Sequence, residues 1–555
     1  MALTRRRPAG WLVTAALAVV PLAVLGVFFV LPVAGMVSRG LFTEDGFDPF
    51  GASEVLTRSR THRVLWFTVW SSAAASLATL LLGLPLTFVL YRLRVPGRQA
   101  ARAFVVMPFV LPTVVVGVAF RTLLAPSGPL GFLRLDGTPV AIVAAMVFFN
   151  LAVVVRTVGG MWENLDPRRE QAAAALGASP WQVLRTVTLP ALAPAIVSAA
   201  SIVFLFCATA FGVVLTLGGL RYATVETEIY LLTTQFLDLR AAAALSILQL
   251  VVVTGLLYAA HVTRTRREHA VERADVRSTL RRVRRTDAPV VAVAVLALAF
   301  VAAPLLALIV GSLRVGDGWG VDHYLALDGR ETGSATALVV PVTQALSNSW
   351  RVAVDATVLA MVLGCLVAAV VSRRGRSRGE RRALAMLDGV FMLPLGVSAV
   401  TLGFGFLITL DRPPLDLRTS PLLVPIAQAM VALPLVVRTL TPVLRSIDPR
   451  QRQAAASLGA SPLRVLRTVD LPVVWRPLLA ATGFAFAVSL GEFGATSFLA
   501  RPEAPTMPVL IYDLVSRPGA DNYGMALAAS VVLGLLTVAV MAAVERLRLA
   551  STGAF

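Results

Sequence analysis

The sequence DPRREQAAAALGASPWQVLRTVTLP, residues Asp166–Pro190, returns almost unchanged as DPRQRQAAASLGASPLRVLRTVDLP at Asp448–Pro472. Nineteen of the 25 aligned positions are identical, at a constant offset of 282 residues in a chain of 555. A repeat at about half of the chain length predicts two copies of one module. In each copy an alanine-rich helical run ends at a glycine, and Ala-Ser-Pro then starts a second short helix. The small side chains would let another backbone approach closely, so we expect a docking element.

The composition indicates a membrane protein with many spans. Hydrophobic residues make up 57% of the chain and charged residues 15%, and the mean hydropathy is +0.78. The net charge of +19 is the difference between 50 basic and 31 acidic residues. All of the basic residues are arginine, and they lie in the segments between apolar runs. This is the positive-inside pattern. Nucleic-acid binding is not expected, because no aromatic residues are interleaved with the arginines of the central segment.

Apolar runs of about 20 residues predict six membrane spans in each half. The predicted spans are 11–36, 64–91, 103–124, 139–160, 190–217 and 241–262, then 289–312, 350–372, 384–410, 421–443, 474–498 and 523–546. We therefore predict an all-α polytopic protein with about 12 transmembrane helices in two parallel six-helix repeats. Its parts would be a first module, an arginine-rich cytoplasmic linker and a second module, at residues 1–263, 264–288 and 289–555 respectively.

The same pattern predicts how the chain is oriented in its membrane. Six is an even number, so both halves cross in the same direction and both repeated loops, 166–190 and 448–472, emerge on one face. The arginine-rich segments place that face, and both termini, in the cytoplasm. An acidic loop that contains Asp317 and Glu331 would then lie outside.

The sequence contains no catalytic constellation. Its four histidines are scattered, and its two cysteines lie inside apolar runs, which predicts neither a disulfide nor a metal site. Without a single lysine, the chain cannot form the Gly-rich phosphate loop that ends in Gly-Lys-Ser/Thr. We therefore expect no enzyme activity and no cofactor on this chain, and any ATP hydrolysis would occur on another polypeptide.

Glu492 is the clearest candidate for a pathway residue, because ionisable side chains inside apolar runs are costly and often functional. Phe493 follows it, and Phe211 stands at the equivalent position of the first half, where Ala210 replaces the glutamate. A cation pathway could use such a carboxylate. The alternative is a structural carboxylate that binds backbone groups freed by the glycines on either side of it.

The repeated loop resembles the EAA loop of ABC-importer permeases, roughly E-A-A-x-x-x-G-A followed by an apolar stretch and Leu-Pro. In that family the loop inserts a short helix into a cleft of the ATPase subunit. The residues that match this motif are Ala172, Ala173, Gly177 and Ala178, and Ala454, Ala455, Gly459 and Ala460. The position of the family's glutamate holds Gln171 and Gln453, so a charge-assisted contact from that position is not expected.

Segments outside the loops resemble the thiamine-importer branch of these permeases. Examples are 206–219 and 223–230 in the first half, and 489–496 with 505–508 in the second. Ferric-iron permeases share the fused two-module arrangement and are the alternative. The resemblance implies a type I ABC importer that moves thiamine or its phosphate ester by alternating access. Its implied partners are an extracytoplasmic binding protein and an ATPase dimer that holds ATP and Mg²⁺.

A secondary transporter of the major-facilitator kind would also have six plus six spans in parallel repeats. Its signature loop lies between the second and third spans, where this chain has the short segment Tyr91–Arg102. The repeated motif instead follows the fourth span of each half, which favours the importer.

Overall fold

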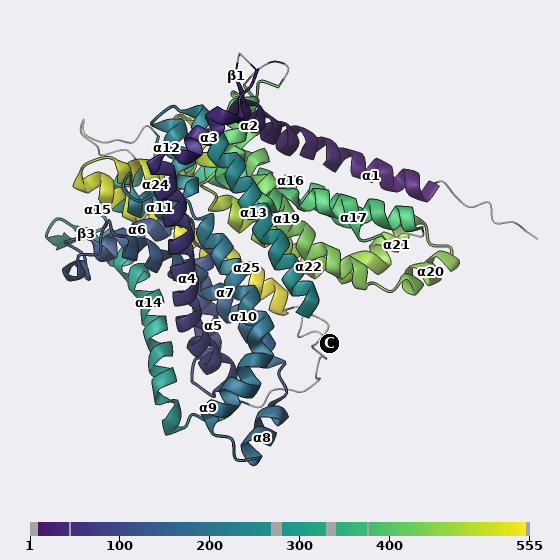
Figure 1. Cartoon of the computed structure of the whole chain (residues 1–555), viewed down its shortest axis with the longest axis horizontal. Helices are drawn as coiled ribbons and strands as arrows, with labels where there is room; N and C mark the ends of the chain where they lie inside the picture. Colours follow the sequence, from purple (N-terminus) through teal and green to yellow (C-terminus); the bar gives the residue numbers. More distant parts are fainter. Residues whose placement is uncertain are drawn as a thin grey trace, which may run out of the picture.

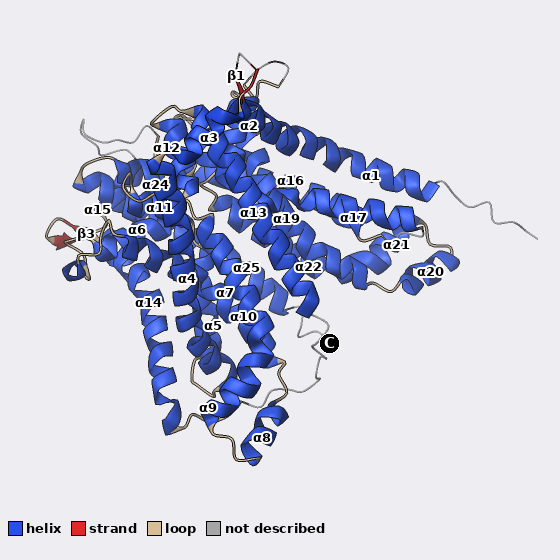
Figure 2. Cartoon of the chain, viewed as in Figure 1, coloured by secondary structure: helices blue, strands red, loops and turns tan. Residues whose placement is uncertain are grey.

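The structure is a computed structural model that describes residues 9–43, 46–267, 280–328, 340–373, 377–411, 413 and 415–550 of the chain. Helices make up nearly all of the described part, and its strands form two short hairpins (Figure 2). Glu331 and residues 268–279 of the predicted linker lie outside the described residues. The predicted all-helical class is confirmed.

The first half contains α1 (Ala9–Leu25), η1 (Gly26–Val30), α2 (Leu31–Leu41), β1 (Phe42–Thr43), β2 (Gly46–Phe47), α3 (Pro49–Thr57), α4 (Ser59–Arg92), α5 (Arg98–Val110), α6 (Thr113–Leu124), η2 (Gly131–Leu133), α7 (Pro139–Glu163), α8 (Pro167–Ala175), α9 (Pro180–Val183), η3 (Leu184–Thr188), α10 (Leu189–Ala208), α11 (Gly212–Gly218), α12 (Val225–Thr234) and α13 (Leu239–Arg267).

The second half repeats this order after η5 (Arg285–Asp287). It contains α14 (Ala288–Ser312), β3 (Arg314–Val315), β4 (Gly318–Trp319), α15 (Asp322–Leu325), η6 (Ala326–Asp328), α16 (Val342–Val371), α17 (Arg378–Met392), η7 (Leu393–Gly396), α18 (Ala399–Thr409), α19 (Leu423–Ser446), α20 (Pro449–Ser457), α21 (Pro462–Val465), η8 (Leu466–Asp470), α22 (Leu471–Leu490), α23 (Thr496–Leu499), α24 (Met507–Ser516) and α25 (Ala520–Ala550).

Ten described helices are long and apolar enough to cross a membrane, and a bent pair brings the number to 11. The bent pair is α5 and α6, which replace the predicted span 103–124 and meet at 105°. Pro112 lies at the bend, where its ring and missing N–H prevent the helix from continuing. The predicted span 384–410 is likewise divided into α17, η7 and α18. Apolar content alone predicts a crossing but not a turn within it.

The first helices of the two halves are exchanged. α14 opens the second half but packs against α4 and α6 of the first half as well as against α25. In the same way, α1 packs against α16, and α2 packs against α18 and α13. The short antiparallel hairpins β1–β2 and β3–β4 follow these exchanged helices in each half. The two halves are therefore interlocked rather than laid side by side.

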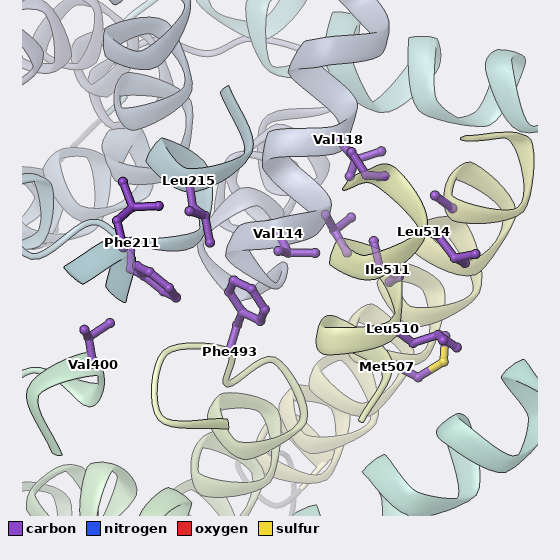
Figure 3. Close-up of a cluster of buried hydrophobic side chains, with 14 of the residues drawn as sticks. Val114, Val118, Phe211, Leu215, Val400, Phe493, Met507, Leu510, Ile511 and Leu514 are labelled. Atoms are coloured by element: carbon purple, nitrogen blue, oxygen red, sulfur yellow. The ribbon is translucent and has the colours of Figure 1, made fainter. Parts of the chain in front are cut away.

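The helices form two arms that diverge from the region of α11, α12 and α24 (Figure 1). One arm carries α8 and α9 at its end, and the other carries α20 and α21. A large buried apolar cluster lies where the arms meet, and it draws side chains from both halves (Figure 3). Its members include Val114, Phe211, Val400, Phe493 and Ile511. Other buried clusters join the halves through the exchanged helices, with Ala297 of α14 among first-half residues and Leu25 of α1 among second-half residues.

Candidate functional site

The two repeated loops adopt the predicted helix–turn–helix. Asp166 accepts a hydrogen bond from the backbone N–H of Arg168 at 2.9 Å, and Asp448 accepts one from Arg450 at 2.9 Å, so each first helix begins at a side-chain cap. Ser179 and Gln182 form a capping box at the start of α9. The sequence therefore specifies both the start and the turn of this element.

Glycine ends the first helix in each loop because the backbone there is left-handed. The φ angle is +87° at Gly177 and +82° at Gly459. The N–H of Ala178 reaches back to the carbonyl of Ala173 at 3.1 Å, and the equivalent bond in the second loop, from Ala460, measures 3.0 Å. This is the Schellman ending of a helix, in which glycine avoids the cost of a Cβ at positive φ.

Both loops present the same uncovered surface. Leu176 and Leu458, at equivalent positions just before the glycines, are each 89% exposed. The predicted coupling residues that are exposed in both loops are Gln171, Ala172 and Gly177 and their equivalents Gln453, Ala454 and Gly459. Ala173, Ala178, Ala455 and Ala460 are half-buried in the turn. Each loop therefore exposes a large apolar side chain directly before the glycine that ends its first helix.

An ion pair stabilises each loop, and we call this ion pair the brace of the loop. The first helix of the loop supplies the acidic partner in the first half and the basic partner in the second half. In the first loop Glu170 accepts hydrogen bonds from Arg92 and from Thr188, the latter at 2.9 Å. In the second loop the same two positions hold Arg452 and Asp470, whose N···O distance is 2.7 Å. Two of the six differences between the repeats, Glu170 to Arg452 and Thr188 to Asp470, are thus in contact. Because both positions change together, each loop keeps a hydrogen bond between them. The sequence showed both differences, but only the fold brings them together.

An aromatic cluster crosses the interface between the halves. Phe211 and Phe493 stack with ring centroids 5.3 Å apart and an interplanar angle of 21°. Tyr230 packs on Phe211 at 5.3 Å, and Tyr512 packs on Phe493 at 5.4 Å. Both pairs, Phe211 with Phe493 and Tyr230 with Tyr512, are separated by 282 residues. We call these four residues the aromatic quartet; Figure 3 shows its two phenylalanines.

Glu492 lies in the break between α22 and α23, next to Phe493, rather than within a continuous span. Its carboxylate accepts hydrogen bonds from the N–H of Ala495 at 2.8 Å and from the N–H and hydroxyl of Thr496 at 3.0 and 2.5 Å. These contacts satisfy backbone N–H groups at the start of α23. They agree with the alternative interpretation of Glu492 as a structural carboxylate. The side chain is 7% exposed. Its neighbour Phe493, not its own oxygens, meets the other half.

Glu226 is a second buried carboxylate, and sequence reasoning missed it. It is 0% exposed and accepts hydrogen bonds from Gln249 and from Ser398 of the second half, the latter at 2.7 Å. No repeat signal identifies it, because its equivalent position holds Pro508. Tyr230 and Tyr512 could have been found by applying the 282-residue offset to aromatic residues. No group of three or more metal-ligating side chains occurs within the described ranges.

Comparison with known proteins finds both halves in one family. The family described as "Binding-protein-dependent transport system inner membrane component" matches residues 79–267 and 356–549. The chain is similar to the thiamine transport system permease protein ThiP of Escherichia coli (strain K12), with 30% identity over 81% of this chain and 83% of that protein. It is also similar to ThiP of Brucella abortus (strain 2308), with 27% identity over 94% of both chains.

A shorter relative matches only part of the chain. The sulfate transport system permease protein CysT of Escherichia coli is 32% identical over 221 residues, which are 38% of this chain and 80% of that protein. The two matched family regions contain both repeated loops and all four residues of the aromatic quartet.

Proposed function

This chain belongs to the family of binding-protein-dependent transport system inner membrane components, and we propose that it carries thiamine or a phosphate ester of thiamine across the cytoplasmic membrane. The observation that supports thiamine as the substrate is the similarity to thiamine permeases along 81–94% of the chain. The ferric-iron alternative would need oxygen-rich ligation, and within the described residues no cluster of such side chains supports it.

The two repeated loops are the proposed docking sites for an ATPase dimer. They have the same fold, the same exposed leucine and the same left-handed glycine, which suits a partner with two equivalent clefts. ATP and Mg²⁺ would bind to that partner, and an extracytoplasmic binding protein would deliver the substrate. Closure of the ATPase dimer would draw the arms together and move the interface between the halves. In this arrangement both termini of the chain lie in the cytoplasm, on the side of the ATPase.

The test is uptake into proteoliposomes that contain this chain together with its ATPase and its binding protein. We expect ATP-dependent uptake of radiolabelled thiamine and none of ferric iron. Leu176→Asp combined with Leu458→Asp should reduce uptake roughly ten-fold or more, because a buried charge without a partner opposes docking. The ATPase should also fail to copurify with this double variant.

Leu325→Asp is the matched control, since Leu325 is 58% exposed and lies outside both loops. It should leave copurification of the ATPase unchanged. Uptake driven by an ion gradient without the ATPase, and unaffected by the leucine changes, would contradict the proposal and favour a secondary transporter. ATP-dependent uptake of ferric iron without thiamine would contradict the proposed substrate alone.

A further inference from the structure

We propose that the aromatic quartet and Glu226 form a site within the permease that holds a flat organic cation during transport. This inference rests on the proposed function and extends it from the imported solute to the residues that contact it. The first observation is that the quartet is built from both halves and follows the internal symmetry. Phe211 and Phe493 lie on the boundary itself, where any movement of one half against the other would separate or slide their rings.

The second observation is that both phenylalanines lie where helices are interrupted. Phe211 lies between α10 and α11, and Phe493 lies between α22 and α23. Non-helical backbone at the depth of a membrane occurs where it is buried in protein or lines a cavity. In transporters such broken helices surround the substrate site. The quartet is therefore placed where a pathway between the halves would pass.

The third observation is the environment of Glu226. This residue lies one helical turn before Tyr230 on α12, so the two side chains share a face of the helix. Both of its hydrogen-bond partners, Gln249 and Ser398, are neutral. The Oε1 atom of Gln249 is itself buried without a hydrogen-bond partner. This part of the interface therefore holds acceptors but no positive charge among the contacts that the structure describes.

A neighbour on the same helix shows the contrast. Glu228 is also buried, but it forms a two-point ion pair with Arg60, at 2.5 and 2.8 Å. Arg60 thus neutralises Glu228, whereas the described contacts of Glu226 include no cation. A buried carboxylate without a cation is costly. A positively charged solute that comes close to Glu226 would offset this cost.

The chemistry of these groups defines the ligand. Phenylalanine and tyrosine faces attract cations and stack on flat rings, and a buried carboxylate adds attraction for positive charge. The two phenyl rings are stacked with Phe211 6% and Phe493 2% exposed, so the site is closed in this structure. Separation of the halves would let a flat cation take the place of one ring against the other. The thiazolium ring of thiamine has this combination of flatness and permanent charge.

Equilibrium binding of radiolabelled thiamine to the permease–ATPase complex in lipid nanodiscs, without binding protein or nucleotide, tests the inference. We expect saturable binding that unlabelled thiamine displaces and that thiochrome, its flat neutral oxidation product, does not. Glu226→Gln should weaken thiamine binding roughly ten-fold and remove the preference over thiochrome. Phe211→Leu should weaken thiamine binding, whereas Phe211→Trp should retain it.

The controls are Glu163→Gln and Phe132→Leu. Glu163 has a side chain that is 51% exposed, and Phe132 is 77% exposed. Neither change should alter binding. Thiamine uptake by the wild-type importer, combined with no saturable binding or with binding that ignores Glu226→Gln and Phe211→Leu, would overturn this inference and leave the proposed function intact. Absence of uptake of both thiamine and its phosphate ester by the wild-type importer would overturn both.

Discussion

Gly177 and Gly459 adopt backbone conformations that other L-residues reach at a cost of roughly 1 to 2 kcal/mol. A Cβ at either position would meet nothing within 4 Å, so the cost of an alanine there comes from the backbone alone. We expect Gly177→Ala to destabilise the first loop by about 1 kcal/mol and to speed its amide hydrogen exchange roughly five-fold. Mass spectrometry of exchange in residues 166–190 would measure this change.

Gly160→Ala is the matched control for that change. A Cβ at Gly160 also meets nothing within 4 Å, but this glycine lies inside α7, where alanine is the better helix former. Its replacement should leave exchange in the loop unchanged. Equal acceleration by both variants would show that left-handed geometry does not decide the stability of the loop.

The braces of the two loops are ion pairs at equivalent positions, so the effect of breaking each one on the stability of its loop can be compared within one molecule. The side chain of Arg92 is 9% exposed, and one of its terminal nitrogens already lacks a partner, so removal of Glu170 would leave a buried guanidinium unpaired. Arg452 and Asp470 are 37% and 16% exposed. We expect Glu170→Gln to destabilise its loop by about 3 kcal/mol and Arg452→Gln to destabilise the other by about 1 kcal/mol or less.

Hydrogen exchange measured in both loops of each variant checks this expectation, because the unmutated loop serves as the internal control. Faster exchange should be confined to 166–190 for Glu170→Gln and to 448–472 for Arg452→Gln. A larger effect from Arg452→Gln than from Glu170→Gln would contradict the assignment of the buried brace to the first loop.

The sequence predicted these elements unevenly, for physical reasons. Both loops could be predicted with their caps and glycines, because helix starts and stops are local signals. The breaks after Val110 and Leu490 were harder, since hydropathy records the length of an apolar run and not its direction. Glu226 could not be found at all. Gln249 reaches it from the next helix, α13, and Ser398 reaches it from the second half, 172 residues away, so only the fold brings these partners together.

At the scale of the whole molecule, the exchanged helices decide how the halves depend on each other. α14 covers part of α4 and α6 in the first half, and α1 and α2 cover part of α16 and α18 in the second half. Each isolated half would therefore expose apolar surface that the intact chain covers. The described end of the linker adds a further contact, because Arg281 exchanges backbone hydrogen bonds with Arg92 and Arg94 at 3.0 and 2.9 Å.

We therefore expect a chain cut between residues 267 and 280 to assemble from two coexpressed pieces, with both pieces copurifying through a tag on one of them. Uptake should then be close to that of the intact chain, because the packing of α14 and α2, rather than covalent connection, holds the halves together. Either piece expressed alone should be degraded or aggregate, since burial of the exchanged helices is lost. Stable, monodisperse accumulation of one piece without the other would show that each half folds independently, and the exchanged helices would then serve only to limit how far the arms can separate.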